Sequence, residues 1–359
     1  LDGQCYAETS IAFVVNSVPI ANAIAPQELC DEDTDGIVAF DTSIVESTIL
    51  GNQTGLIVKY FDANGDALPS PLPNPFYTES QTVTVRLENP QYRVCYEETT
   101  VSFIVRTKPE VQLDEEAIIC MTGNPHLQVS VDNPNSNYTY SWTDENNSTI
   151  SNSSTADLVK GGVYTVVASS EYGCKSDTKY ITVEESSISS ITINYLEIID
   201  DSENNSIEIN TQNIGLGDYE FSLLDTDSNS IYDYQKTPFF DNLEGGIYTV
   251  LIKDKNGCGI QSFETSIISY PKFFTPNNDG INDVWTLKGI SKNNYKSATI
   301  RIFNRYGKII AQASIDDKGW DGSYNGKPLP SNDYWFYIEL IGVNGTKRSK
   351  KGNFSLIRK

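Results

Sequence analysis

The chain has 359 residues, of which 38% are hydrophobic and 11% aromatic, and its formal net charge is −22. This length predicts about two to four domains with ample core in each, and the acidic balance argues against nucleic acid as a partner. Short runs of Tyr, Thr, Val and Ile between Asn, Asp, Gly and Ser predict strands and turns, and no apolar stretch reaches the ~18 residues of a membrane-spanning helix.

The beginning of the chain resembles a later part of it. CYAETSIAFVVNSVP (Cys5–Pro19) and CYEETTVSFIVRTKP (Cys95–Pro109) are identical at seven of fifteen positions. We therefore interpret residues 1–17 as the end of a preceding repeat. The first residues, LDGQCYAETS, lack the basic start and apolar core of an export signal. Because Leu1 stands where Met is expected, we expect a fragment of a longer protein.

A second pair of similar segments lies further along the chain. VKGGVYTVVASSEYGC (Val159–Cys174) and LEGGIYTVLIKDKNGC (Leu243–Cys258) share seven of sixteen positions. Units of this size, built from runs that alternate apolar and polar residues, are typical of immunoglobulin-like sandwiches of antiparallel strands. We predict an all-β protein with such domains at 18–108, 109–186 and 187–268, followed by a small antiparallel sandwich at 269–359.

The six cysteines recur at repeat-bound positions, which suits an oxidising or extracellular setting. Six cysteines allow 15 pairings, so the sequence alone does not fix them. The repeats favour one disulfide within each unit, Cys30 with Cys95 and Cys120 with Cys174. Cys5 and Cys258 are left without an obvious mate. The absence of a CxxC pair argues against zinc.

The segment CDEDTDGIVAFD (Cys30–Asp41) contains a D-x-D-x-D-G pattern. Three carboxylates around one turn match the oxygen ligands that calcium prefers, so we name Asp31, Asp33, Asp35 and Asp41 as candidate ligands. The EF-hand form requires Glu at loop position 12, where this chain has Thr42. The alternative is an acidic surface turn held by Asx hydrogen bonds.

Catalysis finds little support in the sequence. The single histidine, His126, has no nucleophile motif such as G-x-S-x-G beside it, and no phosphate-binding glycine loop is present. The many carboxylates lie mainly in turns, where a solvated acid is the usual interpretation. We expect no active site in this chain.

The last ninety residues differ from the rest in charge. Residues 270–359 hold 15 Lys and Arg against 7 Asp and Glu, a net charge of +8, whereas residues 1–269 hold 11 against 41, a net charge of −30. This asymmetry suggests that the two parts meet different partners.

Five motifs appear in order in this region: FTPNNDGINDVW, IRIFNRYGKII, GWDGSYNGKPLP, YWFYIEL and KGNFSLIRK. Together they resemble the gliding-motility-associated C-terminal domain, or type B sorting domain, of the type 9 secretion system in Bacteroidota. One departure is Asn278, where the family commonly has glycine; asparagine tolerates the left-handed conformation, so the turn can form. The residues that carry the resemblance are Phe274, Pro276, Asn277, Asp279, Gly280, Asn282, Asp283, Trp285, Phe303, Asn304, Arg305, Gly307, Trp320, Asp321, Gly322, Gly326, Pro330, Tyr334, Trp335 and Gly352.

The resemblance implies a signal for export through the type 9 translocon and for attachment at the cell surface, with a PorP/SprF-like outer-membrane barrel protein as a partner. The upstream repeats, with their CDEDTDG and LPSPLPNP segments, also resemble those of large flavobacterial surface adhesins. We therefore expect the C-terminal part of a secreted adhesin of the gliding-motility type. Two alternatives stay open: the non-catalytic tail of a secreted hydrolase, and calcium-dependent glycan binding by one of the sandwiches.

The first of the five motifs is itself a candidate metal loop. Asn277, Asp279 and Asp283 place alternating oxygen ligands around Gly280, as calcium requires. Stabilisation of the turn by Asx hydrogen bonds is the other interpretation.

Overall fold

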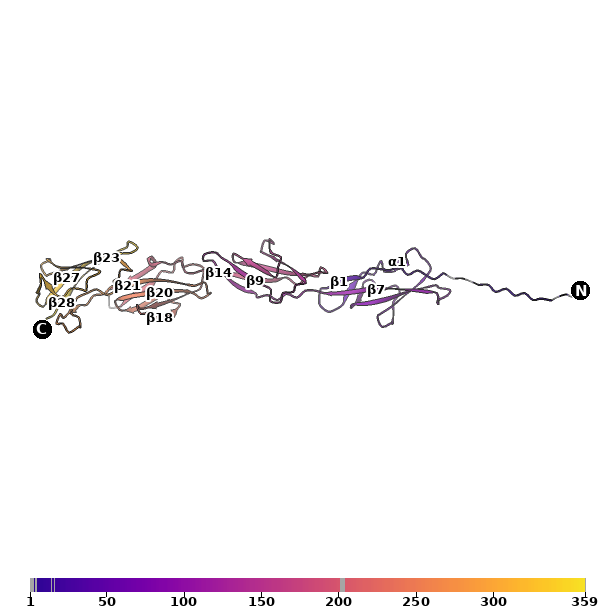
Figure 1. The fold of residues 1–359 in the computed structure, drawn as a ribbon, viewed down its shortest axis with the longest axis horizontal. Coiled ribbons are helices and arrows are strands. Elements are labelled where there is room, and N and C mark those ends of the chain that lie inside the picture. Colours follow the sequence, from indigo (N-terminus) through magenta and orange to yellow (C-terminus); the bar gives the residue numbers. More distant parts are fainter. Residues whose placement is uncertain (1–2, 4, 14, 16, 201–203, 359) are drawn as a thin grey trace. The chain divides into compact units, whose positions relative to one another are not determined.

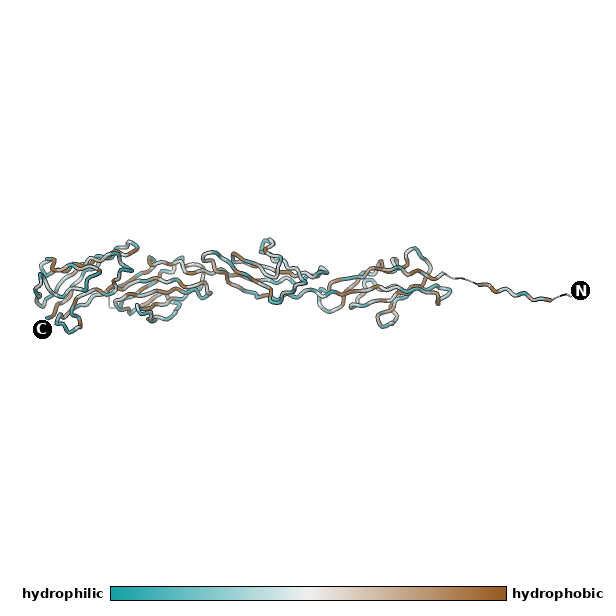
Figure 2. The backbone as a smooth tube through the Cα atoms, viewed as in Figure 1, coloured by the Kyte–Doolittle hydropathy of each residue, from teal (hydrophilic) through white to brown (hydrophobic). Residues whose placement is uncertain are grey.

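The computed structural model describes residues 3, 5–13, 15, 17–200 and 204–358. These residues divide into two compact units, one of residues 1–115, 128–157 and 162–182 and the other of residues 116–127, 158–161 and 183–359. Nearly all regular structure in the described residues is β-strand (Figure 1). The predicted all-β class with immunoglobulin-like sandwiches is confirmed. In Figure 2 the hydrophobic stretches follow the strands, and hydrophilic stretches mark many of the connecting loops.

The first sandwich contains a five-stranded sheet in the order β1-β7-β6-β3-β4 and a two-stranded sheet, β2-β5. Its first strand runs parallel to the last, with Cys30 opposite Arg106. Phe40, Phe76 and Phe103 meet edge to face in its core. The elements are β1 (Gln27–Asp31), β2 (Val38–Phe40), α1 (Val45–Leu50), β3 (Ile57–Phe61), β4 (Ala67–Leu68), β5 (Phe76–Thr78), β6 (Gln81–Glu88) and β7 (Tyr96–Thr107).

The second sandwich has a five-stranded sheet, β11-β10-β13-β14-β8, and a two-stranded sheet, β12-β9. Trp142, on the third strand of this sandwich, is fully buried, and its indole nitrogen donates to the Ser153 carbonyl at 3.0 Å. The strands are β8 (Glu116–Cys120), β9 (Leu127–Ser130), β10 (Tyr138–Thr143), β11 (Thr149–Ser151), β12 (Thr155–Leu158), β13 (Gly162–Ser170) and β14 (Lys179–Ser186).

The third sandwich pairs a three-stranded sheet, β15-β16-β19, with a four-stranded sheet, β18-β17-β20-β21. Its core is aliphatic and aromatic, with Ile207, Phe240 and Ile252 fully buried. A short 3-10 helix (Ile193–Tyr195) precedes the strands β15 (Leu196–Ile199), β16 (Asn205–Ile209), β17 (Tyr219–Leu224), β18 (Ser230–Gln235), β19 (Phe239–Leu243), β20 (Gly246–Asp254) and β21 (Ile260–Ile267).

The C-terminal module is a five-stranded sheet in the order β22-β28-β27-β23-β24, with a small hairpin, β25-β26. Its strands are antiparallel except β22, which runs parallel to β28. The strands are β22 (Phe273–Phe274), β23 (Tyr295–Phe303), β24 (Ile309–Ser314), β25 (Ser323–Tyr324), β26 (Lys327–Pro328), β27 (Asn332–Gly342) and β28 (Lys347–Leu356).

The segment interpreted as the end of a preceding repeat, 1–17, includes residues 1, 2, 4, 14 and 16, which lie outside the described residues. Its described residues form no strand. Ile11 and Phe13 are 75% and 87% exposed, whereas Val101 and Phe103, which match them in the repeat, are buried in β7. The same sequence pattern is therefore buried only where neighbouring strands cover it.

Candidate functional site

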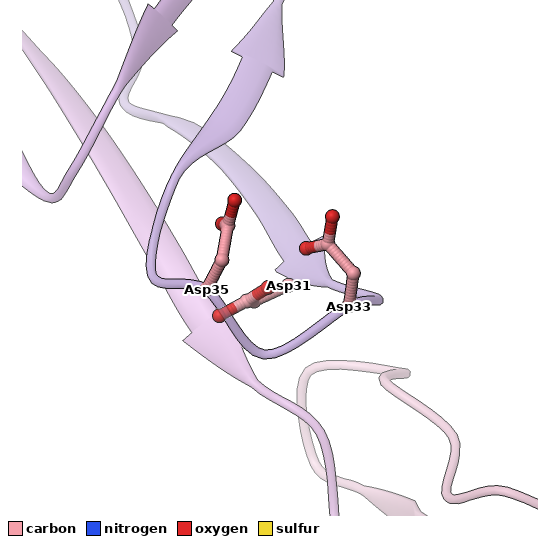
Figure 3. A group of neighbouring side chains, drawn as sticks. All are labelled: Asp31, Asp33 and Asp35. Atoms are coloured by element: carbon pink, nitrogen blue, oxygen red, sulfur yellow. The ribbon is translucent and has the colours of Figure 1, made fainter.

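The acidic loop of the first sandwich follows β1 directly. Carboxylate oxygens of Asp31, Asp33 and Asp35 all lie within 4.8 Å of one another. In Figure 3 the side chains of Asp33 and Asp35 rise on the same side of the loop, and the Asp31 side chain lies between them. The loop thus brings together three of the four calcium ligands predicted for the segment Cys30–Asp41.

Backbone amides already engage this loop. Both oxygens of Asp31 accept N–H groups, from Thr34 at 2.8 Å and from Gly36 at 2.9 Å, and Asp35 accepts that of Ile37 at 2.8 Å. Asp41 stands apart from the group; its carboxylate accepts the Ser43 N–H at 2.9 Å, and this bond lowers the pKa of Asp41. The Asx hydrogen bonds of the alternative interpretation are therefore present, whether or not an ion also binds.

The loop FTPNNDGINDVW in the C-terminal module is organised around Asp283. Its carboxylate accepts N–H groups from Asn277, Asn278 and Gly280 at 2.9, 2.6 and 2.7 Å. The Gly280 amide and its neighbours lower the pKa of Asp283, because each hydrogen bond favours the charged form. Asn278 has φ 62°, the left-handed conformation expected when asparagine replaces glycine.

The tryptophan that ends this loop anchors the module core. Trp285 is 1% exposed, stacks on Phe354 at a centroid distance of 4.2 Å, and donates its indole N–H to the Pro271 carbonyl at 3.0 Å. The main chains of Trp285 and Trp320 exchange two hydrogen bonds of 2.8 Å. The first and third motifs, thirty-five residues apart, are thus one structural unit.

Two motif glycines mark close approaches to this core. A Cβ at Gly352 would lie 2.8 Å from atoms of Phe336 and Tyr270. At Gly322, where φ is +75°, a Cβ would lie 2.4 Å from Leu356. Both positions exclude larger residues because an aromatic or aliphatic side chain occupies the space.

Arg358 joins the motifs to one another, and the sequence patterns did not single it out. Its guanidinium donates to the carbonyls of Leu329 (2.9 Å), Pro276 (3.2 Å), Gly322 (3.2 Å) and Asp321 (3.4 Å). These carbonyls belong to the first and third motifs, and Arg358 belongs to the fifth. The only sequence feature that points to Arg358 is its place near the end of the fifth motif, KGNFSLIRK.

The disulfides differ from the predicted pairing. Cys30 bonds to Cys174 and Cys120 bonds to Cys258, while Cys5 and Cys95 are free. Pairing within a repeat is wrong because Cys30 lies beside Arg106, near the end of β7, whereas Cys95 precedes the start of that strand. The eleven residue steps from position 95 to position 106 span about 36 Å in a strand, and a disulfide joins Cα atoms less than about 7 Å apart.

The Cys30–Cys174 bond joins the first strand of one sandwich to a hairpin turn of the next, with Cα atoms 5.5 Å apart. Around it, the Arg106 guanidinium lies 3.6 Å from the Tyr172 ring centroid, and Lys108 pairs with Asp177 at 3.0 Å. Cys174 itself is 1% exposed. The junction therefore combines a covalent bond with cation–π and ionic contacts.

The Cys120–Cys258 bond repeats this arrangement between the second and third sandwiches, with Cα atoms 5.4 Å apart. Here the Ser186 hydroxyl donates to Asp254 at 2.9 Å in a buried position, and the Cys258 N–H donates to the same carboxylate at 3.0 Å. Each disulfide thus fastens a first strand to the hairpin turn of the sandwich that follows.

Two family models match this chain. Residues 268–356 match the CHU_C Type IX secretion signal domain, and residues 26–109 match the Flavobacterium inter-domain disulphide bond domain. The second match agrees with the disulfide that leaves the first sandwich at Cys30. No curated protein sequence matches the chain significantly.

Several solved structures give weak matches, among them proteins with tandem immunoglobulin domains. The eight N-terminal domains of Down syndrome cell adhesion molecule share 12% identity over 90% of this chain and 45% of that one, with a TM-score of 0.32. The insect immune protein hemolin shares 10% identity over 96% and 100%, with a TM-score of 0.29. A Ca²⁺-stabilised, ice-binding adhesin of an Antarctic bacterium shares 9% over 85% and 90%, with a TM-score of 0.26. This chain spans under half of the first of these proteins.

Fold and family matches together define the class of protein. The chain contains immunoglobulin-like sandwiches and, at residues 268–356, a type IX secretion signal domain, which together define a secreted cell-surface protein. The predicted C-terminal sorting signal is confirmed, and so is the predicted destination, because this signal directs export across the outer membrane to the cell surface. Among the described residues, no helix has the length and apolarity needed to cross a membrane.

Proposed function

We propose that this chain is the C-terminal portion of a cell-surface adhesin of the gliding-motility type, and that its sorting module is of type B. The sandwiches serve as a stalk that holds a distal part away from the cell. The observation that carries the proposal is the joining of successive sandwiches by disulfides, ahead of a secretion module of opposite charge. Covalent junctions suit a protein that transmits force between a surface and the cell.

The sorting role is tested by removing the module. Deletion of residues 269–359 should leave the protein in the periplasm, whereas a control with Val343→Ala, an exposed position of the same module outside the five motifs, should reach the surface. Surface labelling of intact cells followed by immunoblotting measures both. Normal display of the deletion variant would contradict the proposal.

For partners, we propose the type 9 translocon and a PorP/SprF-like outer-membrane barrel protein. Support comes from the +8 charge of residues 270–359, which suits an acidic partner surface. A pull-down from outer membranes with the full chain as bait should recover the barrel protein, and the deletion variant should not.

We infer that the chain is non-catalytic. As a second candidate function, it is the non-catalytic tail of a secreted hydrolase. The full-length coding sequence of the gene distinguishes them. Further ninety-residue repeats favour the adhesin, and a catalytic module favours the hydrolase.

Calcium binding by the first sandwich is also a proposal, and glycan or surface-ligand binding by the sandwiches would accompany it. Its support is the convergence of Asp31, Asp33 and Asp35. Calorimetric titration of the chelator-treated protein with Ca²⁺ should give a binding isotherm that Asp33→Asn abolishes, while Asp227→Asn, an exposed aspartate of the third sandwich, leaves it unchanged. A titration of the wild-type protein that shows no heat of binding would contradict the proposed calcium binding.

A further inference from the structure

The junction before the C-terminal module lacks the cysteines of the two preceding junctions. Cys30 and Cys120 lie at or near the end of the first strand of their sandwiches, β1 and β8. In the third sandwich the first strand is β15, and Asp200 follows its last residue, Ile199. β1 pairs with the last strand of its sandwich, whereas β15 pairs with β16. Despite this difference, β1, β8 and β15 each end at a junction between neighbouring modules.

Asp200 contacts the next module as the cysteines do. Its carboxylate forms ion pairs with Arg348 and Lys350 of β28, the strand that follows the β27–β28 hairpin turn. The sequence separation between Asp200 and Arg348 is 148 residues, and the two disulfides span 144 and 138 residues. An anion and two cations therefore stand where the earlier junctions have a covalent bond.

The cluster is shielded from solvent and hydrogen-bonded. The Asp200 side chain is 6% exposed, and those of Arg348 and Lys350 are 25% and 17% exposed. Arg348 also donates to the Tyr295 hydroxyl at 2.7 Å, and Lys350 donates to the Asp200 carbonyl at 3.1 Å. Loss of one partner would leave a largely buried charge uncompensated, which is far more costly than loss of a surface pair.

The chain itself passes between the two cores at this point without a linker. Ile267 is buried in the core of the third sandwich, and the next residue, Ile268, is buried in the core of the C-terminal module. The Ile268 N–H donates to an oxygen of Asp200 at 3.2 Å. The ion cluster therefore holds the connecting peptide as well as β28.

We propose that Asp200, Arg348 and Lys350 form a non-covalent counterpart of the two disulfides, which fastens the secretion module to the last sandwich and can open without a redox reaction. The inference rests on the proposed function, in which this module alone engages the export machinery. A disulfide would need a reductant to open, whereas an ion cluster separates and re-forms without chemical change. The sandwiches then stay covalently joined while the module remains free to release its contact.

Hydrogen–deuterium exchange of the full chain tests the proposal through one amide at each of two junctions. The Ile268 amide reports on the ion cluster, and the Ile188 amide, which donates to the Thr122 hydroxyl at 2.9 Å, reports on the junction closed by Cys120–Cys258. Asp200→Asn should accelerate exchange at Ile268 about tenfold or more and leave Ile188 unchanged. Reduction with dithiothreitol should accelerate exchange at Ile188 and leave exchange at Ile268 unchanged.

Matched controls separate a local opening from general loss of stability. Glu197→Gln changes an exposed carboxylate on β15, and Lys347→Gln changes an exposed cation on β28; neither should alter exchange at Ile268. Arg348→Gln gives a second variant if Asp200→Asn fails to fold. Unchanged exchange at Ile268 in the cluster variants, or equal acceleration in the strand β20, would overturn the proposal. The deletion experiment on surface display is independent of this readout, so either idea can fail alone.

Discussion

At the residue scale, polar side chains in this protein mainly hold turns, and aromatic side chains hold the C-terminal module. Asp31 and Asp283 look alike in the sequence because each lies in an acidic loop with glycine. In the structure each carboxylate accepts backbone N–H groups, at 2.8–2.9 Å for Asp31 and at 2.6–2.9 Å for Asp283. Both residues thus have a structural role that does not depend on a bound ion.

Substitution of Trp285 tests the core of the module. Trp285→Ala removes a side chain that is 1% exposed and stacked on Phe354, and we expect a loss of about 3–5 kcal/mol in the free energy of unfolding. Trp335→Ala, at a side chain 42% exposed, should cost at most about 1 kcal/mol. Denaturant unfolding followed by tryptophan fluorescence and circular dichroism measures both; equal losses would contradict this account.

The lowered pKa of Asp283 predicts that the stability of the folded state depends on pH. Its folded-state pKa is lowered from 3.8 by the Gly280, Asn278 and Asn277 amides, so the folded state binds its proton less readily than the unfolded state. The stabilisation is fully present above pH 3.8 and is lost as the pH falls through the lowered value. Thermal melts between pH 5 and pH 2 should show a shallower decline in Asp283→Asn than in wild type; identical slopes would exclude this role.

At the element scale, the important contacts join a first strand to a hairpin of the following module. Cys30 with Cys174 and Cys120 with Cys258 make this connection covalently, and Asp200 with Arg348 makes it by charge. Long closed loops restrict the unfolded chain, and separations of 144 and 138 residues correspond to about 5 kcal/mol each in the chain-entropy model.

Alkylation tests the pairing. In native protein, iodoacetamide should label Cys5 and Cys95, and label the other four cysteines only after reduction. Cys174→Ser should lower the free energy of unfolding by up to about 5 kcal/mol, whereas Cys95→Ser should change it little. Peptide mapping that recovered a Cys30–Cys95 pair would contradict the structure.

At the scale of the whole molecule, no disulfide among the described residues crosses the core of a sandwich. Both disulfides join neighbouring sandwiches, so reduction should release junctions and leave the cores folded. We expect dithiothreitol at 25 °C to leave the far-UV circular dichroism unchanged and to lower the unfolding midpoint. A collapse of the β signal on reduction would show that the cores depend on the cross-links.

Alternation and repeats in the sequence determined the all-β class, because half-buried strands need an apolar residue at every second position. The order of the five motifs was enough to identify the secretion module. Their aromatic residues Phe274, Trp285, Trp320 and Tyr334 form part of its core. The predicted left-handed conformation of Asn278 is confirmed by its φ of 62°.

Which distant groups meet depends on how strands far apart in the sequence pack together. Cys30 and Cys95 bracket one repeat in the sequence, yet they lie at opposite ends of β7, because β1 runs parallel to that strand. Arg358 gains its four carbonyl partners, and Asp200 its two cations, only when strands far apart in sequence pack together. Periodicity in a sequence fixes which face of a strand is buried, but long-range partners depend on strand direction and register, which local patterns do not encode.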